Sequence, residues 1–213
     1  MAQDASRPEF WETRYRDGVT PWDAGGAPPR FEAWVRSLAP GTRVLVPGCG
    51  SAHEVRLLAE AGVHVLAIDF SAAAVALARE RLGSLAHRVM EADFFHFNAG
   101  EGFDAVYERA FLCALPRHLW PAYGQRMAQL LQAGGQLSGY FFFDDNTRGP
   151  PFGTSEQTLD TLLGSAFSRE LDEAVTGSLP IFEGKERWQH WRRRDTDNAR
   201  PSGPATLHGM PRR

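Results

Sequence analysis

The chain has 213 residues, of which 43% are hydrophobic and 23% are charged, as expected for one globular domain with a buried core. Its formal net charge of -3 lacks the basic surplus that phosphate contacts require, so we expect no nucleic-acid partner. No run approaches the roughly 18 apolar residues that span a bilayer, and the polar N-terminus has no signal-peptide core. We therefore expect a cytoplasmic protein without a membrane partner. The two cysteines, Cys49 and Cys113, form no CxxC pair, so no metal site is expected.

The N-terminal part predicts two helices separated by an irregular loop. Residues 8–16 form the first, because Ser6 and Glu9 have the spacing of a capping box and Pro8 is acceptable in a first helical turn. Residues 31–38 form the second, because their apolar side chains recur at helical spacing.

The middle of the chain alternates buried strands with helices. Ser71 can cap one helix, and a long helical stripe at residues 119–131 is expected to stop at the glycine pair 134–135. Such alternation implies parallel strands with helices on both faces of the sheet. The predicted strands are residues 43–47, residues 64–69, a short strand centred on Val89, residues 103–108 and residues 136–143.

The C-terminal part has a different pattern. Residues 155–163 are predicted as a helix, and residues 167–175 and 186–194 as an antiparallel hairpin added to the sheet. Residues 195–213 show no periodicity and are rich in proline and glycine, which predicts a disordered tail. We therefore predict a single domain over residues 1–194.

The loop after the first strand contains a glycine motif, Gly48-Cys49-Gly50. Gly48 can adopt a backbone turn that other residues resist, and Gly50 lets the chain approach a ligand closely. Asp69 ends the second strand, 19 residues after Gly50, which suits an acid that binds ribose hydroxyls. His53 stands where the dinucleotide fingerprint needs a third glycine, so a pyrophosphate site is disfavoured. The alternative is a plain strand-to-helix turn with Asp69 as a helix cap.

Asp93 and Phe94 follow the third predicted strand. In folds of this class that position lies under an adenine, where an acid can accept from the exocyclic amine and a ring can stack. The alternative is a capping acid beside a core phenylalanine.

Several segments together resemble the thiopurine S-methyltransferase family, and most of all its thiol and halide methyltransferase branch. The most specific is the Trp-Asp segment followed by the Val-Pro-Gly-Cys-Gly loop. The resemblance spans residues 10–194. The segments are 10–15 (FWETRY), 20–23 (TPWD), 44–50 (VLVPGCG), 107–115 (YERAFLCAL), 149–152 (GPPF) and 184–188 (GKERW).

The resemblance implies a Rossmann-like class I methyltransferase fold, α/β, with a seven-stranded, mostly parallel sheet whose last strand is antiparallel. It also implies S-adenosylmethionine as cofactor, S-adenosylhomocysteine as its product, and a monomer that acts on a small-molecule acceptor. Carried over by position, the residues expected to bind the cofactor are Trp11, Tyr15, Trp22, Gly48, Gly50, Asp69, Asp93, Phe94 and Arg109.

Two positions depart from the thiol and halide branch. Tyr15 stands where a tryptophan is common in that branch. Arg109 stands where that branch often has tyrosine, and at this position the chain is more similar to the thiopurine enzymes. The branch and the acceptor therefore stay open. Trp11 and Tyr15 could also be a helix face packed on the sheet, and Arg109 a surface charge.

The chemistry expected is in-line transfer of an activated methyl group to a small soft nucleophile such as a thiol, sulfide, halide or thiopurine. A free thiol has a pKa of about 8.5, so a strong general base is optional, and no catalytic residue is assigned. Candidates for the acceptor pocket are Phe111, Phe152 and the acids Asp144 and Asp145, which follow the fifth predicted strand.

Three other functions stay open. The enzyme could methylate nitrogen or oxygen of a small metabolite, because a fold does not determine the acceptor. The chain could bind the cofactor without turnover, as a sensor or interaction module. An NAD-dependent oxidoreductase is the remaining alternative.

Overall fold

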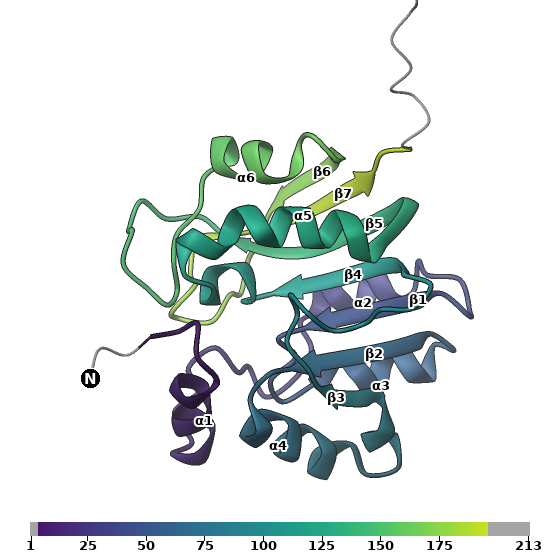
Figure 1. Cartoon of the computed structure of the whole chain (residues 1–213), viewed down its shortest axis with the longest axis vertical. Coiled ribbons are helices and arrows are strands. Elements are labelled where there is room, and N and C mark those ends of the chain that lie inside the picture. Colours follow the sequence, from purple (N-terminus) through teal and green to yellow (C-terminus); the bar gives the residue numbers. More distant parts are fainter. Residues whose placement is uncertain (1–3, 196–213) are drawn as a thin grey trace, which may run out of the picture.

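The computed structural model describes residues 4–195, which form one sheet of seven strands in the order β3-β2-β1-β4-β5-β7-β6, with helices around it (Figure 1). In chain order, the elements are α1 (Pro8–Arg16), α2 (Pro29–Val35), β1 (Arg43–Pro47), α3 (His53–Glu60), β2 (His64–Asp69), α4 (Ala72–Leu82), β3 (Val89–Glu91), β4 (Phe103–Arg109), α5 (Trp120–Leu130), β5 (Leu131–Phe142), α6 (Glu156–Leu163), β6 (Phe167–Ala174) and β7 (Glu186–Arg193).

The sheet is mostly parallel. Strands β1 to β5 pair in parallel, whereas β7 is antiparallel to both of its neighbours, β5 and β6. This confirms the predicted fold class and the antiparallel last strand. The hairpin predicted from the sequence is also present, and its second strand, β7, is the one that contacts β5.

Two apolar cores lie on opposite faces of the sheet, because successive side chains of a strand point to opposite sides. On one face, α2, α3 and α4 pack against Val44 and Val46 of β1. On the other, α5 and α6 pack against Leu45 of β1 and Leu137 of β5 (Figure 1).

Of the two helix starts with a predicted cap, one agrees with the prediction and one differs. The hydroxyl of Ser71 accepts from the amide of Ala74 at the start of α4, as predicted. The capping box predicted for α1 is absent: its N-cap is Arg7 without a side-chain hydrogen bond. The Ser6 hydroxyl instead donates to Asp4 at 2.7 Å, since this nearer acceptor precedes it in the same turn.

The junction of α5 and β5 also differs from the prediction. The helix ends at Leu130, and Leu131 already pairs with Phe103 of β4. The glycine pair expected to end the helix therefore lies inside β5. Gly134 has a φ of +71°, and a Cβ at Gly135 would be 3.1 Å from the Asp104 carbonyl oxygen. Glycine is needed there for an irregular stretch of strand close to its neighbour. Likewise, α2 covers residues 29–35, and Leu38 packs on the core from outside the helix.

The parallel strands end at one edge of the sheet, and the chain reverses its direction of winding between β1 and β4. Ligands of open α/β sheets bind at such a switch point. No helix among residues 4–195 is long and apolar enough to cross a membrane. The predicted tail of residues 195–213 lies outside the described residues, apart from Asp195.

Candidate functional site

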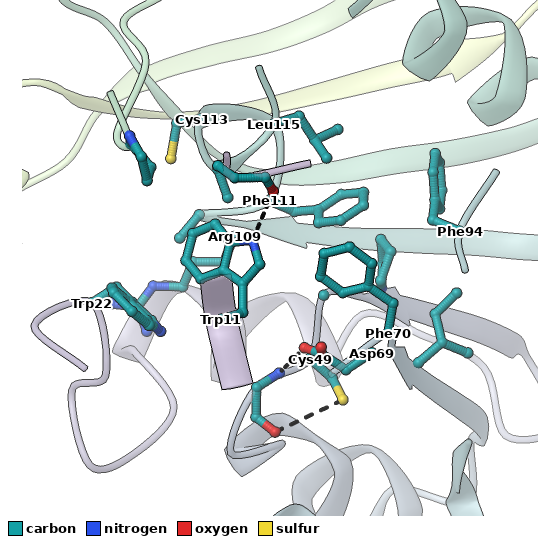
Figure 2. Close-up of a pocket in the computed structure, with 18 of the residues that line it drawn as sticks. Trp11, Trp22, Cys49, Asp69, Phe70, Phe94, Arg109, Phe111, Cys113 and Leu115 are labelled. Carbon is teal, nitrogen blue, oxygen red and sulfur yellow. Dashed lines mark hydrogen bonds between the residues drawn. The ribbon is translucent and has the colours of Figure 1, made fainter. Parts of the chain in front are cut away.

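A cavity of about 550 Å³ lies at the carboxyl ends of the parallel strands, with α1 forming part of its wall (Figure 2). Concave sites of this size, with mixed apolar and polar walls, typically bind small molecules. The structure brings together at this cavity every residue predicted to bind the cofactor, and Phe111 as well. These residues are Trp11, Tyr15, Trp22, Gly48, Gly50, Asp69, Asp93, Phe94 and Arg109.

The two loop glycines are required by the aromatic side chains that pack on them. Gly48 and Gly50 have φ values of +59° and +50°, a region that favours glycine. A Cβ at Gly48 would collide with the ring of Phe111, and one at Gly50 would collide with the hydroxyl oxygen of Tyr15. The loop therefore lies directly against two residues that line the cavity.

Asp69 is buried at the end of β2, and the backbone fixes its carboxylate. One oxygen accepts from the amide of Gly50 at 3.0 Å, and the other from the amide of Ser71 at 2.9 Å. Burial raises the pKa of Asp69 to about 6, against the lowering effect of these amides. Each oxygen has one further lone pair, so the carboxylate can accept from two ligand hydroxyls.

Asp93 and Phe94 form the end of the cavity next to β3. Asp93 accepts from the amide of Phe95 at 2.8 Å and lies 2.5 Å from Nδ1 of His96. Phe94 is buried and meets Phe111 edge to face at a centroid distance of 5.0 Å. Phe94 thus belongs both to the core and to the cavity wall.

Three aromatic side chains of the N-terminal segment form a cover. The rings of Trp11 and Trp22 meet edge to face at 5.3 Å (Figure 2). The indole of Trp22 donates to the hydroxyl of Tyr15 at 3.3 Å, and that of Trp11 donates to the Ala5 carbonyl at 2.8 Å. Both indole N–H groups therefore have hydrogen-bond partners in the N-terminal segment, and the apolar surfaces of the rings face the cavity.

Asp23, which the sequence analysis did not single out, ties this cover to the glycine loop. Its carboxylate accepts from the Ser51 hydroxyl at 2.5 Å and lies 2.7 Å from Nε2 of His53. It also accepts from the amide of Gly25 at 2.8 Å. These contacts, with the hydrogen bond to His53 foremost, lower the pKa of Asp23 well below its usual range. The only available sequence signal was its place in the TPWD segment.

Glu54 was also missed. It lies in the first turn of α3 and lines the cavity with Arg109, although it is only 8% exposed. A buried acid in the first helical turn is easily interpreted as a charge that complements the helix dipole. Its nearness to Arg109 depends on the fold.

The predicted acceptor residues separate into two groups. Phe111 lines the cavity, but Asp144, Asp145 and Phe152 are not among its lining residues. Asp144 forms an ion pair with Lys185 at 2.5 Å, which draws its carboxylate to the surface loop. Phe152 packs in the core behind Phe111. The wall next to β4 and β7 is instead formed by Cys113, Pro150, Pro151, Ile181 and Phe182.

Glu108 is the buried acid nearest this wall. It is 1% exposed, and one oxygen accepts from the amides of Phe111 and Leu112 at 2.9 and 3.0 Å. Burial raises the pKa of Glu108 to about 7. Glu108 therefore holds the segment that carries Phe111 onto Gly48, and it does so from outside the cavity.

The cysteines offer no covalent chemistry here. Cys49 and Cys113 are free and buried, and burial raises the pKa of both thiols. A thiol that stays protonated is a poor nucleophile. Residues 4–195 contain no group of three or more His, Cys, Asp or Glu side chains that could hold a metal ion. The site can bind, orient and exclude water.

Comparison with known proteins places the chain among methyltransferases. The profile of a family described as thiopurine S-methyltransferase matches residues 6–194. The probable thiol methyltransferase 2 of Arabidopsis thaliana is 32% identical over 189 residues, covering 84% of each chain. Thiocyanate methyltransferase 1 of Brassica oleracea is 32% identical over 190 residues, covering 86% of this chain and 84% of that protein. A thiopurine S-methyltransferase of Azotobacter vinelandii is 31% identical, covering 78% and 86%.

Solved structures agree on the fold. The N-methyltransferase NodS of Bradyrhizobium japonicum, in complex with S-adenosylhomocysteine, superposes with a TM-score of 0.71 at 18% identity, covering 88% of this chain and 99% of that one. A didemethyltoxoflavin N1-methyltransferase of Burkholderia thailandensis gives 0.70 at 20% identity, covering 88% and 87%. At such identities the likeness concerns the fold alone.

Proposed function

Because this chain belongs to the thiopurine S-methyltransferase family and is therefore an S-adenosylmethionine-dependent methyltransferase, we propose that it methylates a small thiol or a related soft nucleophile, such as sulfide, a halide or a thiopurine. The observation that carries this proposal is the composition of the cavity wall next to β4 and β7, which we call the acceptor wall. Cys113, Pro150, Pro151 and Phe182 make that wall apolar, which suits a polarisable, weakly hydrated nucleophile.

The described residues fit the cofactor. A nucleoside needs an acid for its ribose and an aromatic surface for its base, and the cavity provides Asp69 for the first and Phe94 with Asp93 for the second. Trp11, Tyr15 and Trp22 would cover the bound molecule, and its amino-acid end would lie toward Gly48 and Arg109. When bound, the cofactor supplies an activated sulfonium methyl group.

The protein's own residues then have a positioning role. Phe111 and the apolar wall hold the acceptor in line with the methyl–sulfur bond, and the aromatic cover excludes water. Such positioning can lower a barrier by ~7–11 kcal/mol in favourable cases. A thiol with a pKa of about 8.5 is partly ionised near neutral pH, so no strong base needs to contact it. We assign no residue as general base.

The test is an acceptor panel that compares matched atoms. Purified protein is incubated with S-adenosylmethionine and thiophenol, phenol or aniline, and with sulfide, iodide, thiocyanate or 6-mercaptopurine, and S-adenosylhomocysteine release is measured. We expect thiophenol or another soft nucleophile to react at least a hundredfold faster than phenol and aniline. A preference for phenol or aniline, or no turnover by a protein that binds S-adenosylhomocysteine, would contradict the proposal.

We also propose that residues 1–194 form one domain that works as a monomer in the cytoplasm, with a small-molecule acceptor and without a nucleic-acid partner. The two free, buried cysteines support a reducing compartment. Light scattering of the purified chain checks the monomer, and a dimer at micromolar concentration would contradict it.

A further inference from the structure

Three polar side chains meet where the cavity passes between β1 and β4. Glu54 comes from the first turn of α3, Tyr107 from the middle of β4, and Arg109 from its last position. All three line the cavity, although Glu54 is only 8% exposed and Tyr107 only 1%. A negative charge, a positive charge and a phenol thus share one largely desolvated corner.

Part of the hydrogen-bonding capacity of this corner is not used within the described part of the protein. The Tyr107 hydroxyl and Nε of Arg109 are buried and have no hydrogen-bond partner among residues 4–195. Burial raises the pKa of Glu54, and the positive charge of Arg109 is among the influences that oppose this rise, so the two side chains interact electrostatically. The ion pairs of this region include none between them, and Arg109 lies instead over the ring of Tyr140, 5.5 Å from its centroid.

The unpartnered polar groups of this corner destabilise the folded protein unless a ligand pairs with them. Buried polar groups without partners cost about 1–3 kcal/mol each, and buried charges cost more. Two opposite charges that are close enough to interact but not paired leave room for a ligand that carries both charges. An amino-acid end, with an ammonium and a carboxylate on one carbon, is such a ligand group.

The position of the corner in the cavity also suits the amino-acid end of a bound cofactor. The groups that suit the adenosine, Asp69 and Asp93, follow β2 and β3, on one side of the glycine loop. The corner is on the opposite side, toward β4, across the switch point between β1 and β4. A cofactor with its ribose at Asp69 and its adenine beside Asp93 would have its amino-acid end directed toward this corner.

We propose that Glu54 binds the ammonium of the cofactor's amino-acid end, while Arg109 binds its carboxylate and the Tyr107 hydroxyl donates to that carboxylate. This proposal rests on the cofactor named above and is independent of the acceptor. It makes Glu54 a binding residue for the cofactor. The competing role is structural, in which the acid only stabilises the start of α3.

The test combines protein variants with truncated ligands, so that a lost contact is separated from a damaged fold. Three ligands are titrated calorimetrically into the full chain: S-adenosylhomocysteine with both charges, its decarboxylated form S-adenosyl-3-thiopropylamine with the ammonium alone, and 5′-methylthioadenosine with neither. The variants are Glu54→Gln, Arg109→Gln and the control Glu60→Gln. Glu60 is an exposed acid at the other end of α3.

We expect Glu54→Gln to weaken binding of both ligands that carry the ammonium by about tenfold or more, as loss of a charge-assisted hydrogen bond predicts. Binding of 5′-methylthioadenosine should change less than twofold. Arg109→Gln should weaken S-adenosylhomocysteine by a similar factor and leave S-adenosyl-3-thiopropylamine within threefold. Glu60→Gln should bind all three ligands as the natural protein does.

Equal losses for all three ligands in Glu54→Gln would overturn the proposal in favour of the structural role, and so would unchanged binding of S-adenosylhomocysteine. If Glu54→Gln does not fold, Glu54→Met, which has a similar length and no charge, replaces it under the same criteria. Absence of S-adenosylhomocysteine binding by the natural protein would also overturn it. Failure of the acceptor panel alone would not, because these titrations contain no acceptor.

Discussion

At the scale of single residues, Asp69 shows how a buried acid is kept ready for a ligand. The amides of Gly50 and Ser71 hold its carboxylate, while burial raises its pKa to about 6. Since ribose hydroxyls donate to the ionised form, ligand binding and deprotonation of Asp69 favour each other.

The pH dependence of cofactor binding follows from this linkage. We expect the affinity for S-adenosylhomocysteine to be constant above about pH 7 and to fall below pH 6 by up to about tenfold for each pH unit, because protonated Asp69 is a poor acceptor. Calorimetry between pH 5 and 8 measures this. Asp69→Asn should bind weakly with no inflection near pH 6, and an inflection that persists in this variant would contradict the assignment.

The contact between Gly50 and Tyr15 gives a second prediction at this scale. Gly50→Ala should lower thermal stability and weaken S-adenosylhomocysteine binding, because the new methyl group collides with the Tyr15 hydroxyl at a φ of +50°. Adding Tyr15→Phe should restore part of the loss, since the next ring atom, Cζ, lies 3.5 Å from the added Cβ. About 1 kcal/mol of backbone strain should remain.

A double variant no more stable than Gly50→Ala alone would show that strain, and not the collision, accounts for the loss. Tyr15→Phe by itself is the control, and its expected effect is small because it removes one hydrogen bond from the Trp22 indole.

Motif spacing predicted the residues that act through their own loop or strand end, namely Gly48, Gly50 and Asp69. It did not find Asp23 or Glu54. Both depend on partners from distant segments: Asp23 meets residues 28 and 30 positions away, and Glu54 faces Arg109 from another element. Such pairings arise from the fold, so a lone acid in the sequence does not reveal them.

At the scale of elements, the loop after α1 is held to the start of α3 and to the last turn of α4. Asp23 contacts Ser51 and His53 at the start of α3, and Arg81 of α4 approaches its carboxylate at 3.9 Å. Trp22, which precedes Asp23, lines the cavity and is thereby held in place. We expect these contacts to slow the release of a cofactor that lies under the cover.

We therefore expect Asp23→Asn to release S-adenosylhomocysteine about tenfold faster, since a half-buried charge-assisted contact with His53 is lost. Stopped-flow tryptophan fluorescence can follow release, because Trp11 and Trp22 line the cavity. Asp17→Asn is the matched control, an exposed acid between α1 and the loop. An unchanged release rate in Asp23→Asn would show that the aromatic contacts alone hold the cover.

Element boundaries were predicted well where local chemistry sets them and poorly where a partner does. The strands β1 and β2 and the capped helix α4 agree with the sequence patterns. The end of α5 does not, because pairing of Leu131 with Phe103 draws that residue into β5. The helical spacing of apolar residues does not show that a neighbouring strand will pair with the last residue of the pattern.

At the scale of the whole molecule, the two apolar cores pack on opposite faces of the sheet, and the cavity lies at the edge where the parallel strands end. The family resemblance predicted the fold, and every residue that it assigned to the cofactor lines the cavity. The acceptor candidates were predicted less well, because only Phe111 among them lines the cavity. Cys113, Pro150 and Pro151 lie in segments that match the family, but their spacing did not single them out, while Asp144 is held outside by Lys185.

The position of β7 has a consequence for how the chain is made. β6 precedes β7 in the sequence, yet its one neighbour in the sheet is β7. During synthesis β6 therefore emerges without a partner, and the edge of β5 stays open until Glu186–Arg193 has left the ribosome. An open edge of β5 can pair with another nascent chain. Aggregation of polysome-bound fragments should thus be greatest just before the last strand appears.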